Sequence, residues 1–178
     1  TDFIRGSFPG YVRDSLLGAI TGVEPPGEIV PCEGEPPMET LVPGTAEGEL
    51  TGGNLALICA LLGTQWEIDT RGKILLLEDT DEPVFRIDRM LTQLRLAGKL
   101  DDAAGIVLGQ FTHIPPRKPK ESFTLPEVLE AIIVPEGKPT LINGCFGHGP
   151  KKATLPLGAR AVLDGSKSTL TVVESGVE

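Results

Sequence analysis

The stretch KILLLEDTDE, residues 73–82, decides the fold that we predict for this chain. After Lys73 it is apolar at every position up to Leu77, which is typical of a strand buried on both faces of a sheet. Four acidic residues follow within five positions, and Asp81 is placed to cap a helix with Pro83 in its first turn. The stretch therefore predicts a central strand that leads through an acidic turn into a helix.

Similar patterns lie on both sides of this stretch. Upstream, Gly52-Gly53-Asn54 leads into an apolar helix over residues 55–62 that a glycine closes. Downstream, the predicted helix ends at Gly98, and residues 105–111 form a second buried strand. The apolar stripe of that helix consists of Val84, Ile87, Met90, Leu91, Leu94 and Ala97. The centre of the chain thus alternates buried strands with helices.

The two ends of the chain are richer in β-structure. Residues 1–22 hold one short amphipathic helix, whose apolar positions are Val12, Leu16, Leu17 and Ile20. Residues 23–48 are rich in Pro, Gly and Glu, and we expect short strands and turns there, with disorder as the alternative. Thr124 opens a capping box before a helix over residues 128–133, and a strand follows at residues 140–143. Residues 159–163 and 169–173 predict a terminal hairpin. The fold class is mixed α/β.

Composition limits the partners and the location of the chain. Its 178 residues suffice for one domain with a real core, and its net charge of −9 argues against nucleic acid or an anionic membrane as partner. Apolar runs are too short to span a bilayer. The three cysteines are odd in number and widely spaced, so we expect no disulfide framework and a cytoplasmic protein. Because the sequence opens at Thr1, we expect a fragment of a longer protein.

Two residues are the candidates for catalysis. Glu78 leaves the buried strand where its carboxylate can still be held by the core, and His148 lies in the glycine-rich stretch GCFGHG, residues 144–149. A carboxylate and an imidazole can be the orienting and base members of a hydrolytic triad. The alternatives are a structural ion pair for Glu78 and a loop hydrogen bond for His148. His113, the other histidine, is predicted to lie on the surface at a strand end.

No residue of this chain has a convincing nucleophile context. Cys145 is three residues from His148, but an unpaired cysteine is more often a small buried hydrophobe. Ser7 resembles a nucleophile elbow only superficially, because Pro9 stands where a helix should follow. Two histidines and three scattered cysteines give no metal-ligand spacing. Gly52, Gly53 and Asn54 open a helix whose free N–H groups could bind a substrate carboxylate, or they simply form a tight turn.

Seven motifs in order resemble the C-terminal domain of the LD-carboxypeptidases, the murein tetrapeptide carboxypeptidase family that also contains the microcin-immunity peptidases. The resemblance covers nearly everything from residue 40 onward. Each motif alone is weak, but their order is specific. The motifs are GGNL at 52–55, GT at 63–64, ILLLED at 74–79, DRMLTQLRLAG at 88–98, GIVLGQF at 105–111, GH at 147–148 and TLPLG at 154–158.

The resemblance implies a fold and a division of the active site. In that family a Ser-Glu-His triad is assembled across two domains, and the C-terminal domain, of a swivelling β/β/α type, supplies the glutamate and the histidine. These positions fall on Glu78 and His148. The serine turn of the N-terminal domain has no counterpart here, so residues 1–22 would be the tail of that absent domain or a linker, and residues 23–178 the C-terminal domain.

The expected function follows from the resemblance. The whole two-domain enzyme would remove the terminal D-alanine from muropeptide tetrapeptides during cell-wall recycling in the cytoplasm. It would form homodimers and need no metal or cofactor, and this chain alone would be inactive. Two alternatives stay open: a microcin-immunity peptidase that cleaves a peptidyl-nucleotide, and a non-catalytic binding domain that kept the fold.

Overall fold

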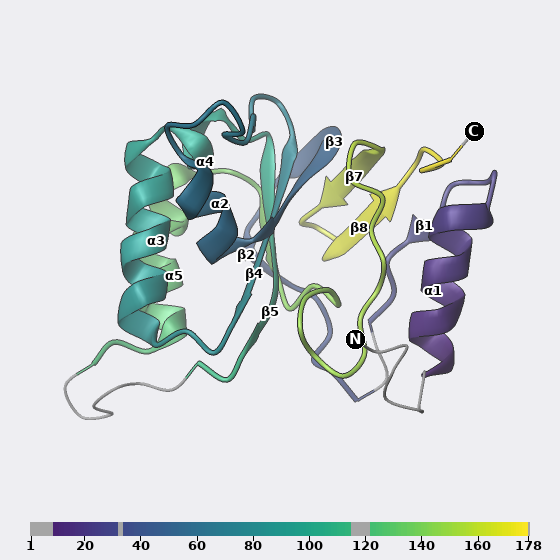
Figure 1. Cartoon of the computed structure of the whole chain (residues 1–178), viewed down its shortest axis with the longest axis horizontal. Coiled ribbons are helices and arrows are strands. Elements are labelled where there is room, and N and C mark those ends of the chain that lie inside the picture. The colour runs from purple at the N-terminus through teal and green to yellow at the C-terminus, as the bar shows by residue number, and fades with distance from the viewer. Residues whose placement is uncertain (1–8, 32–33, 115–121, 178) are drawn as a thin grey trace.

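The computed structural model describes residues 9–31, 34–114 and 122–177. These residues form an eight-stranded sheet in the order β1-β8-β7-β3-β4-β5-β6-β2 (Figure 1). The elements are α1 (Gly10–Thr21), β1 (Gly27–Glu28), β2 (Glu39–Val42), β3 (Thr45–Asn54), α2 (Leu55–Leu61), β4 (Ile74–Thr80), α3 (Val84–Leu96), α4 (Lys99–Asp102), β5 (Gly105–Thr112), α5 (Leu125–Ile132), the 3-10 helix η2 (Val134–Glu136), β6 (Thr140–Ile142), β7 (Arg160–Asp164) and β8 (Thr169–Val172). The mixed α/β prediction is confirmed. None of the described helices has the length and apolar content needed to cross a bilayer.

Strand β4 lies at the centre of the sheet and is buried on both faces. It runs parallel to β3 and β5, and β6 runs parallel to β5. Leu75 and Leu77 point into the core beneath the helices, whereas Ile74 and Leu76 point into a second core on the opposite face. Alternate side chains therefore serve two cores, which explains why this run has no polar face.

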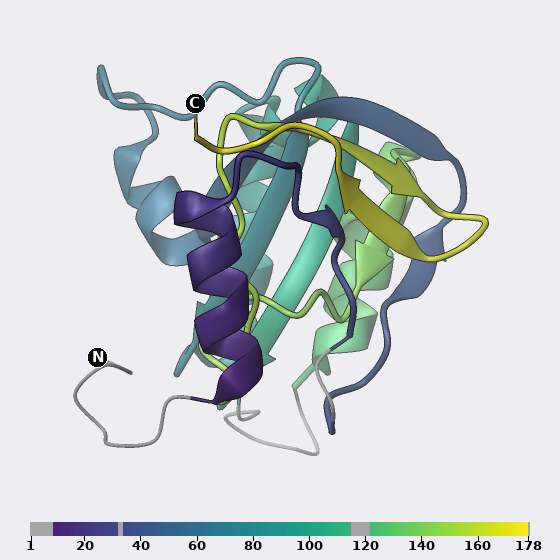
Figure 2. The same cartoon turned by 90° about the vertical axis from the view of Figure 1, so that its right-hand side faces the viewer.

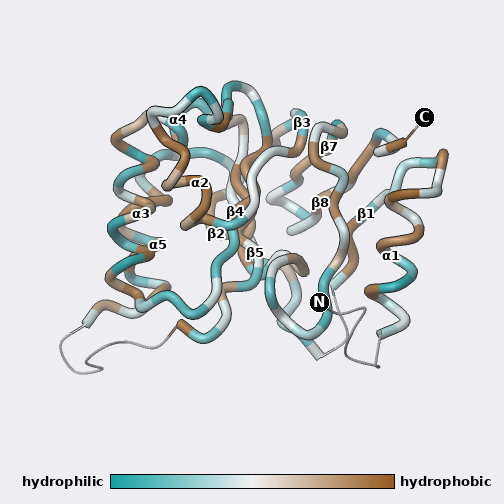
Figure 3. Tube along the Cα trace, in the orientation of Figure 1, coloured by the Kyte–Doolittle hydropathy of each residue, from teal (hydrophilic) through white to brown (hydrophobic). Residues whose placement is uncertain are grey.

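The helices α2, α3 and α5 cover one face of the parallel strands (Figure 1). Figure 3 shows polar and apolar residues mixed along α3 and α5, whereas α2 is apolar throughout and leaves Leu57 and Leu61 exposed. In α3 the buried side chains are Val84, Ile87, Met90, Leu91 and Leu94, which confirms the predicted stripe except at Ala97, an exposed residue at the C-cap. Gly98 follows with a positive φ of 74°, a conformation that glycine adopts at little cost and that ends the helix.

The opposite face is covered by the terminal hairpin. Strand β3 joins the two parts of the sheet, because residues 45–49 pair with β7 and residues 50–54 pair with β4. The predicted hairpin is present as β7 and β8, and its apolar residues close the second core. Figure 2 shows α1 lying in front of the sheet, on the hairpin side.

The N-terminal helix is present, but of its four predicted apolar positions only Val12 is buried. Helix α1 ends before Gly22, as expected. Its buried side chains are Val12 and Ala19, whereas Leu17 and Ile20 are exposed. The helix contacts the rest of the chain along one narrow face, so helical periodicity alone did not identify the buried residues. The assignment of residues 1–22 to a tail or linker stays a prediction.

The helix starts differ in how well the sequence predicted them. The capping box at Thr124 is confirmed, with Glu127 bonded back to the cap, although the helix begins at Leu125. Asp81 does not cap α3; the helix begins after Pro83. Because β4 continues to Thr80, Asp81 is a turn residue with φ of 59°, a conformation that an aspartate tolerates but that an N-cap does not use.

Candidate active site

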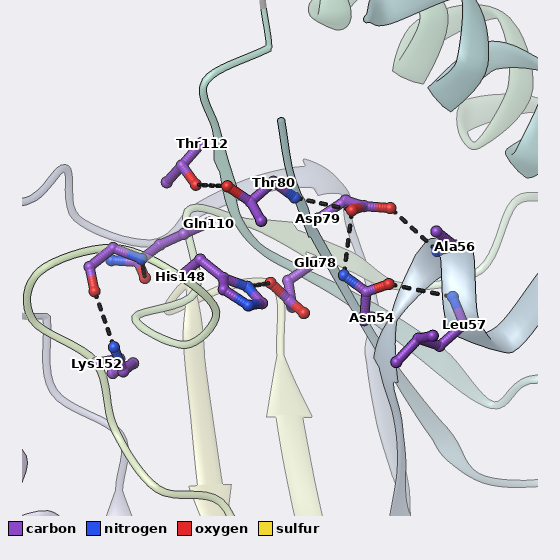
Figure 4. Close-up of polar contacts among 11 residues, drawn as sticks. Asn54, Ala56, Leu57, Glu78, Asp79, Thr80, Gln110, Thr112, His148 and Lys152 are labelled. Carbon is purple, nitrogen blue, oxygen red and sulfur yellow. Dashed lines mark hydrogen bonds and ion pairs between the residues drawn. The ribbon is translucent and has the colours of Figure 1, made fainter. Parts of the chain in front are cut away.

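The carboxyl ends of β4 and β5 meet the loop that follows β6. Glu78 lies near the end of β4, and His148 lies in that loop. His148 Nδ1 is 2.7 Å from Glu78 Oε2, although the two residues are 70 positions apart, and Figure 4 shows the side chains pointing toward each other. The structure thus brings together the two residues that the sequence singled out.

Burial differs sharply between these two side chains. Glu78 is 6% exposed and points to the same face of β4 as Leu76, whereas the His148 side chain is 53% exposed. Because Nδ1 is engaged by the carboxylate, Nε2 is the nitrogen that can exchange a proton with a reacting group. A buried carboxylate behind an accessible imidazole can orient that imidazole and stabilise its charged form.

Gly147 permits the close approach of the His148 loop. Its φ is 126°, which L-residues rarely adopt. A Cβ at this position would lie 3.0 Å from Glu78 Oε2 and 3.1 Å from the carbonyl oxygen of Gln110. The glycine before the histidine is therefore required both by its backbone conformation and by the space beside Glu78.

Asp79 points to the other face of the sheet, toward α2 (Figure 4). It is 2% exposed, and its carboxylate accepts hydrogen bonds from Asn54 Nδ2 at 3.1 Å, Ala56 N at 3.0 Å and Thr80 N at 2.8 Å. Its negative charge adds to burial in raising the pKa of the Cys59 thiol to about 11. The sequence analysis gave Asp79 no role; strand alternation after Glu78 was the signal that it faces the helices.

The Gly52-Gly53-Asn54 segment lies directly beside the end of β4 that carries Glu78. It forms the end of β3, and Asn54 pairs with Glu78 across the parallel strands. A Cβ on Gly52 would lie 2.0 Å from the carbonyl oxygen of Leu76, so only glycine fits there. Asn54 caps α2 by accepting a hydrogen bond from Leu57 N at 3.1 Å.

The expected free N–H groups at this helix start are not free. Leu57 N is bonded to Asn54 and Ala56 N to Asp79, so the expectation of open anion-binding donors is wrong for these two groups. The segment thus supplies hydrogen-bond acceptors from within the domain for these two N–H groups of the helix start. A substrate-binding role for Gly52, Gly53 and Asn54 stays a prediction that now depends on their place beside Glu78.

The other candidates have different settings. Cys145 is disulfide-bonded, which corrects the expectation that it is an unpaired thiol and removes it as a nucleophile. Ser7 lies outside the described residues. Ser15 accepts a hydrogen bond from Thr154 N at 2.8 Å in α1. His113 is exposed one residue beyond β5, as predicted. No group of three or more His, Cys, Asp or Glu residues in the described ranges could hold a metal ion.

A carboxylate–imidazole pair at the carboxyl edge of parallel strands is the kind of site that hydrolases with a nucleophilic side chain use. Residues 47–163 match the family model described as "LD-carboxypeptidase C-terminal domain". The chain belongs to the LD-carboxypeptidase family, and the resemblance that the sequence motifs indicated is confirmed.

Relatives and solved structures agree with this assignment. The chain is 48% identical over 141 residues to the Bacillus subtilis "Probable murein peptide carboxypeptidase", which covers 79% of this chain and 44% of that protein. The crystal structure of muramoyltetrapeptide carboxypeptidase from Oxalobacter formigenes superposes with a TM-score of 0.80 at 28% identity, over 98% of this chain and 59% of that one.

A microcin-immunity protein shares the same fold. The structure of MccF in complex with glutamyl sulfamoyl guanosine has a TM-score of 0.70 at 25% identity, and the match covers 79% of this chain and 42% of that one. MccF of Escherichia coli is 29% identical over 137 residues. The chain spans about half the length of the curated relatives that it matches first.

Proposed function

We propose that this chain supplies the glutamate and the histidine of a Ser-Glu-His triad in an LD-carboxypeptidase. The whole enzyme would remove the terminal D-alanine from muropeptide tetrapeptides. The observation that carries the proposal is the 2.7 Å contact between Glu78 and His148 within a domain of this family. A second domain would supply the serine, which accords with relatives about twice as long as this chain.

The proposed reaction assigns one step to each side chain. The serine hydroxyl attacks the carbonyl carbon of the L-to-D peptide bond while His148 Nε2 takes its proton. His148 then gives that proton to the nitrogen of the leaving D-alanine, which breaks the bond and leaves an acyl-enzyme. His148 next takes a proton from water, whose oxygen attacks the acyl carbon. His148 then gives that proton to the serine oxygen as its bond to the acyl carbon breaks, which releases the shortened peptide and restores the serine hydroxyl. Glu78 holds the imidazole tautomer and stabilises the imidazolium.

Residues beside this pair would complete substrate recognition. Gly52, Gly53 and Asn54 adjoin Glu78 along β3 and are our candidates for contacts with the substrate end. The whole enzyme would act as a homodimer in the cytoplasm, where cell-wall fragments are recycled. A cytoplasmic location predicts that the disulfide of Cys145 is reduced in protein taken from cells, which thiol counting measures; an intact disulfide would contradict that location.

A peptidyl-nucleotide is the second candidate substrate. The likeness to MccF, whose structure was solved with glutamyl sulfamoyl guanosine, favours an immunity role over a purely structural one. Both candidate reactions would cleave an amide bond by attack on its carbonyl carbon. The same Glu78 and His148 would therefore serve either substrate. The substrate would be decided by the part of the pocket that binds the leaving amine.

The test is release of D-alanine from a muropeptide tetrapeptide. We expect release by the longer two-domain protein, a loss of at least about 10³-fold in its His148→Ala variant, and none from this chain alone. Release by this chain alone, lost in His148→Ala, would place the nucleophile within these residues. Absence of release from tetrapeptide and peptidyl-nucleotide alike would leave the non-catalytic binding domain as the better account.

A further inference from the structure

Strand β5 contains an extra residue opposite the catalytic carboxylate. Leu77 of β4 pairs with Leu108 of β5. The next pair joins Asp79 to Phe111, so a two-residue step on β4 faces a three-residue step on β5. Leu108 and Phe111 consequently both pack toward the helix-side core, which a regular strand would not allow. Such a bulge re-aims the intervening side chains, here including Gln110.

Gln110 is bonded to the main chain on both sides of His148. Its Oε1 accepts a hydrogen bond from Gly149 N at 2.9 Å, and its Nε2 donates to the carbonyl oxygen of Lys151 at 2.9 Å. Its own N–H donates to the carbonyl oxygen of Phe146 at 2.8 Å. The side-chain amide thus uses both its donor and its acceptor on the loop, and its backbone fixes the loop's entry.

The fit between Gln110 and the loop leaves no spare room. A Cβ on Gly149 would lie 2.4 Å from Gln110 Nε2, and a Cβ on Gly147 would lie 3.1 Å from Gln110 O. Glycine at both positions therefore lets the loop lie directly against this residue. His148 itself is half exposed, so packing of its own ring contributes little to holding it.

We propose that Gln110 is a positioning residue that holds the His148 loop so that Nδ1 stays on Glu78. The inference rests on the proposed function for its catalytic consequence, but the contact itself is a property of this chain. Without the amide, Gly149 N and Lys151 O each lose the hydrogen bond to Gln110, and the loop gains freedom at these two residues. A misplacement of about 1 Å at a catalytic group can cost about 10²-fold in rate.

The first arm of the test needs no turnover. In this chain carrying His113→Asn, which leaves one of the two histidines, the ¹H NMR signal of the His148 Nδ1–H reports the bond to Glu78. We expect that Gln110→Ala speeds exchange of this proton at least about tenfold. Gln110→Glu keeps the acceptor for Gly149 N and should give an intermediate rate. Gln93→Ala, the same change at an exposed position of α3, should change nothing.

The second arm measures kinetics in the longer protein. Gln110→Ala should lower kcat about 30-fold while KM changes less than about twofold, because the base and not the substrate contacts is displaced. If Gln110→Ala fails to fold, Gln110→Glu decides by the same two measurements. Unchanged proton exchange in either folded variant would overturn the proposal. Changed exchange in a protein without peptidase activity would uphold the positioning and count against the proposed function alone.

Discussion

Glu78 and Asp79 are adjacent in the chain, yet they face opposite sides of the sheet and meet different partners. Asp79 faces the helices, where three donors from its own domain surround the carboxylate. Glu78 faces the hairpin side, where its partner is a half-exposed histidine from a distant loop. One carboxylate joins elements of the fold, and the other holds a group that can react. Both carboxylates are buried. The two roles differ because the partner of Glu78 is exposed to solvent.

The largest expected effect is on catalysis at Glu78. Glu78→Gln in the longer protein should lower kcat by about 10³–10⁴-fold, because the amide cannot hold the imidazole tautomer or stabilise its charge. The free energy of unfolding should change by less than about 1 kcal/mol, since the bond to a half-exposed ring contributes little net stability. Steady-state kinetics and urea unfolding measure the two quantities.

Glu82→Gln is the matched control for that variant. Glu82 lies in the same acidic run and pairs with Arg86 at 3.1 Å on the surface of α3. Such exposed pairs are worth about 0–1 kcal/mol, so neither rate nor stability should change appreciably. An equal loss of kcat in both variants would mean that the acidic run acts through net charge, which the account does not allow.

Asp79 should show the reverse pattern. Asp79→Asn places an NH₂ group where the carboxylate now accepts bonds, so at least one of its three donors loses its partner. We expect the free energy of unfolding to fall by about 2 kcal/mol and Tm by about 6 °C, measured by calorimetry on this chain. Asp81→Asn, at an exposed turn position that also tolerates asparagine, should have no measurable effect.

Asn54 adjoins both carboxylates, since it pairs with Glu78 across the strands and donates to Asp79. Its substitution should lower the free energy of unfolding by less than that of Asp79. Asn54→Ala removes the cap of α2 and should cost about 1 kcal/mol of stability. Asn54→Ser keeps a capping oxygen but is too short to donate to Asp79 as Asn54 does now, so it should recover part of that loss. If Asn54→Ser were as unstable as Asn54→Ala, the bond to Asp79 and not the cap would be the main contribution.

The smallest expected effect is on the thiol of Cys59. Burial and then the charge of Asp79 raise its pKa to about 11, with Arg89 opposing them. Between the ordinary pKa of a thiol and about pH 11, the unfolded chain loses the Cys59 proton while the folded protein keeps it. The free energy of unfolding therefore falls as the pH rises through this range, and the contribution is fully present below it. In Asp79→Asn the midpoint of the alkylation rate should move to lower pH. An unmoved midpoint would mean that burial alone raises the pKa of the thiol.

The sequence predicted the strands and the pairing of Glu78 with His148 better than the details around them. The apolar run to Leu77 correctly indicated a strand buried on both faces. The glycines around His148 correctly indicated a loop that approaches another segment closely. Chain order of the motifs then related His148 to Glu78. Apolar patterning and the positions of glycines are local features, and both can be recognised in a single sequence.

Other features depend on contacts that no local pattern displays. Asp81 was expected to cap α3. Strand β4, however, continues for three residues beyond its last apolar residue, Leu77, and ends at Thr80. The bulge that turns Gln110 toward the loop is defined by how β5 pairs with β4, and the sequence of β5 alone does not show that pairing. The partners of Asp79 come from β3 and α2, about 25 residues upstream. Helix donors that the sequence left open for a substrate are therefore already used inside the domain.

The central claim is that this domain activates a serine that lies outside residues 1–178. The most direct measurement is the rate at which the longer protein reacts with a fluorophosphonate, whose phosphorus bonds to an activated serine oxygen as fluoride leaves. The account predicts a single labelled serine upstream of this chain and a loss of labelling of at least about 10²-fold in His148→Ala. Labelling of a serine within residues 1–178, or an unchanged rate in His148→Ala, would contradict it.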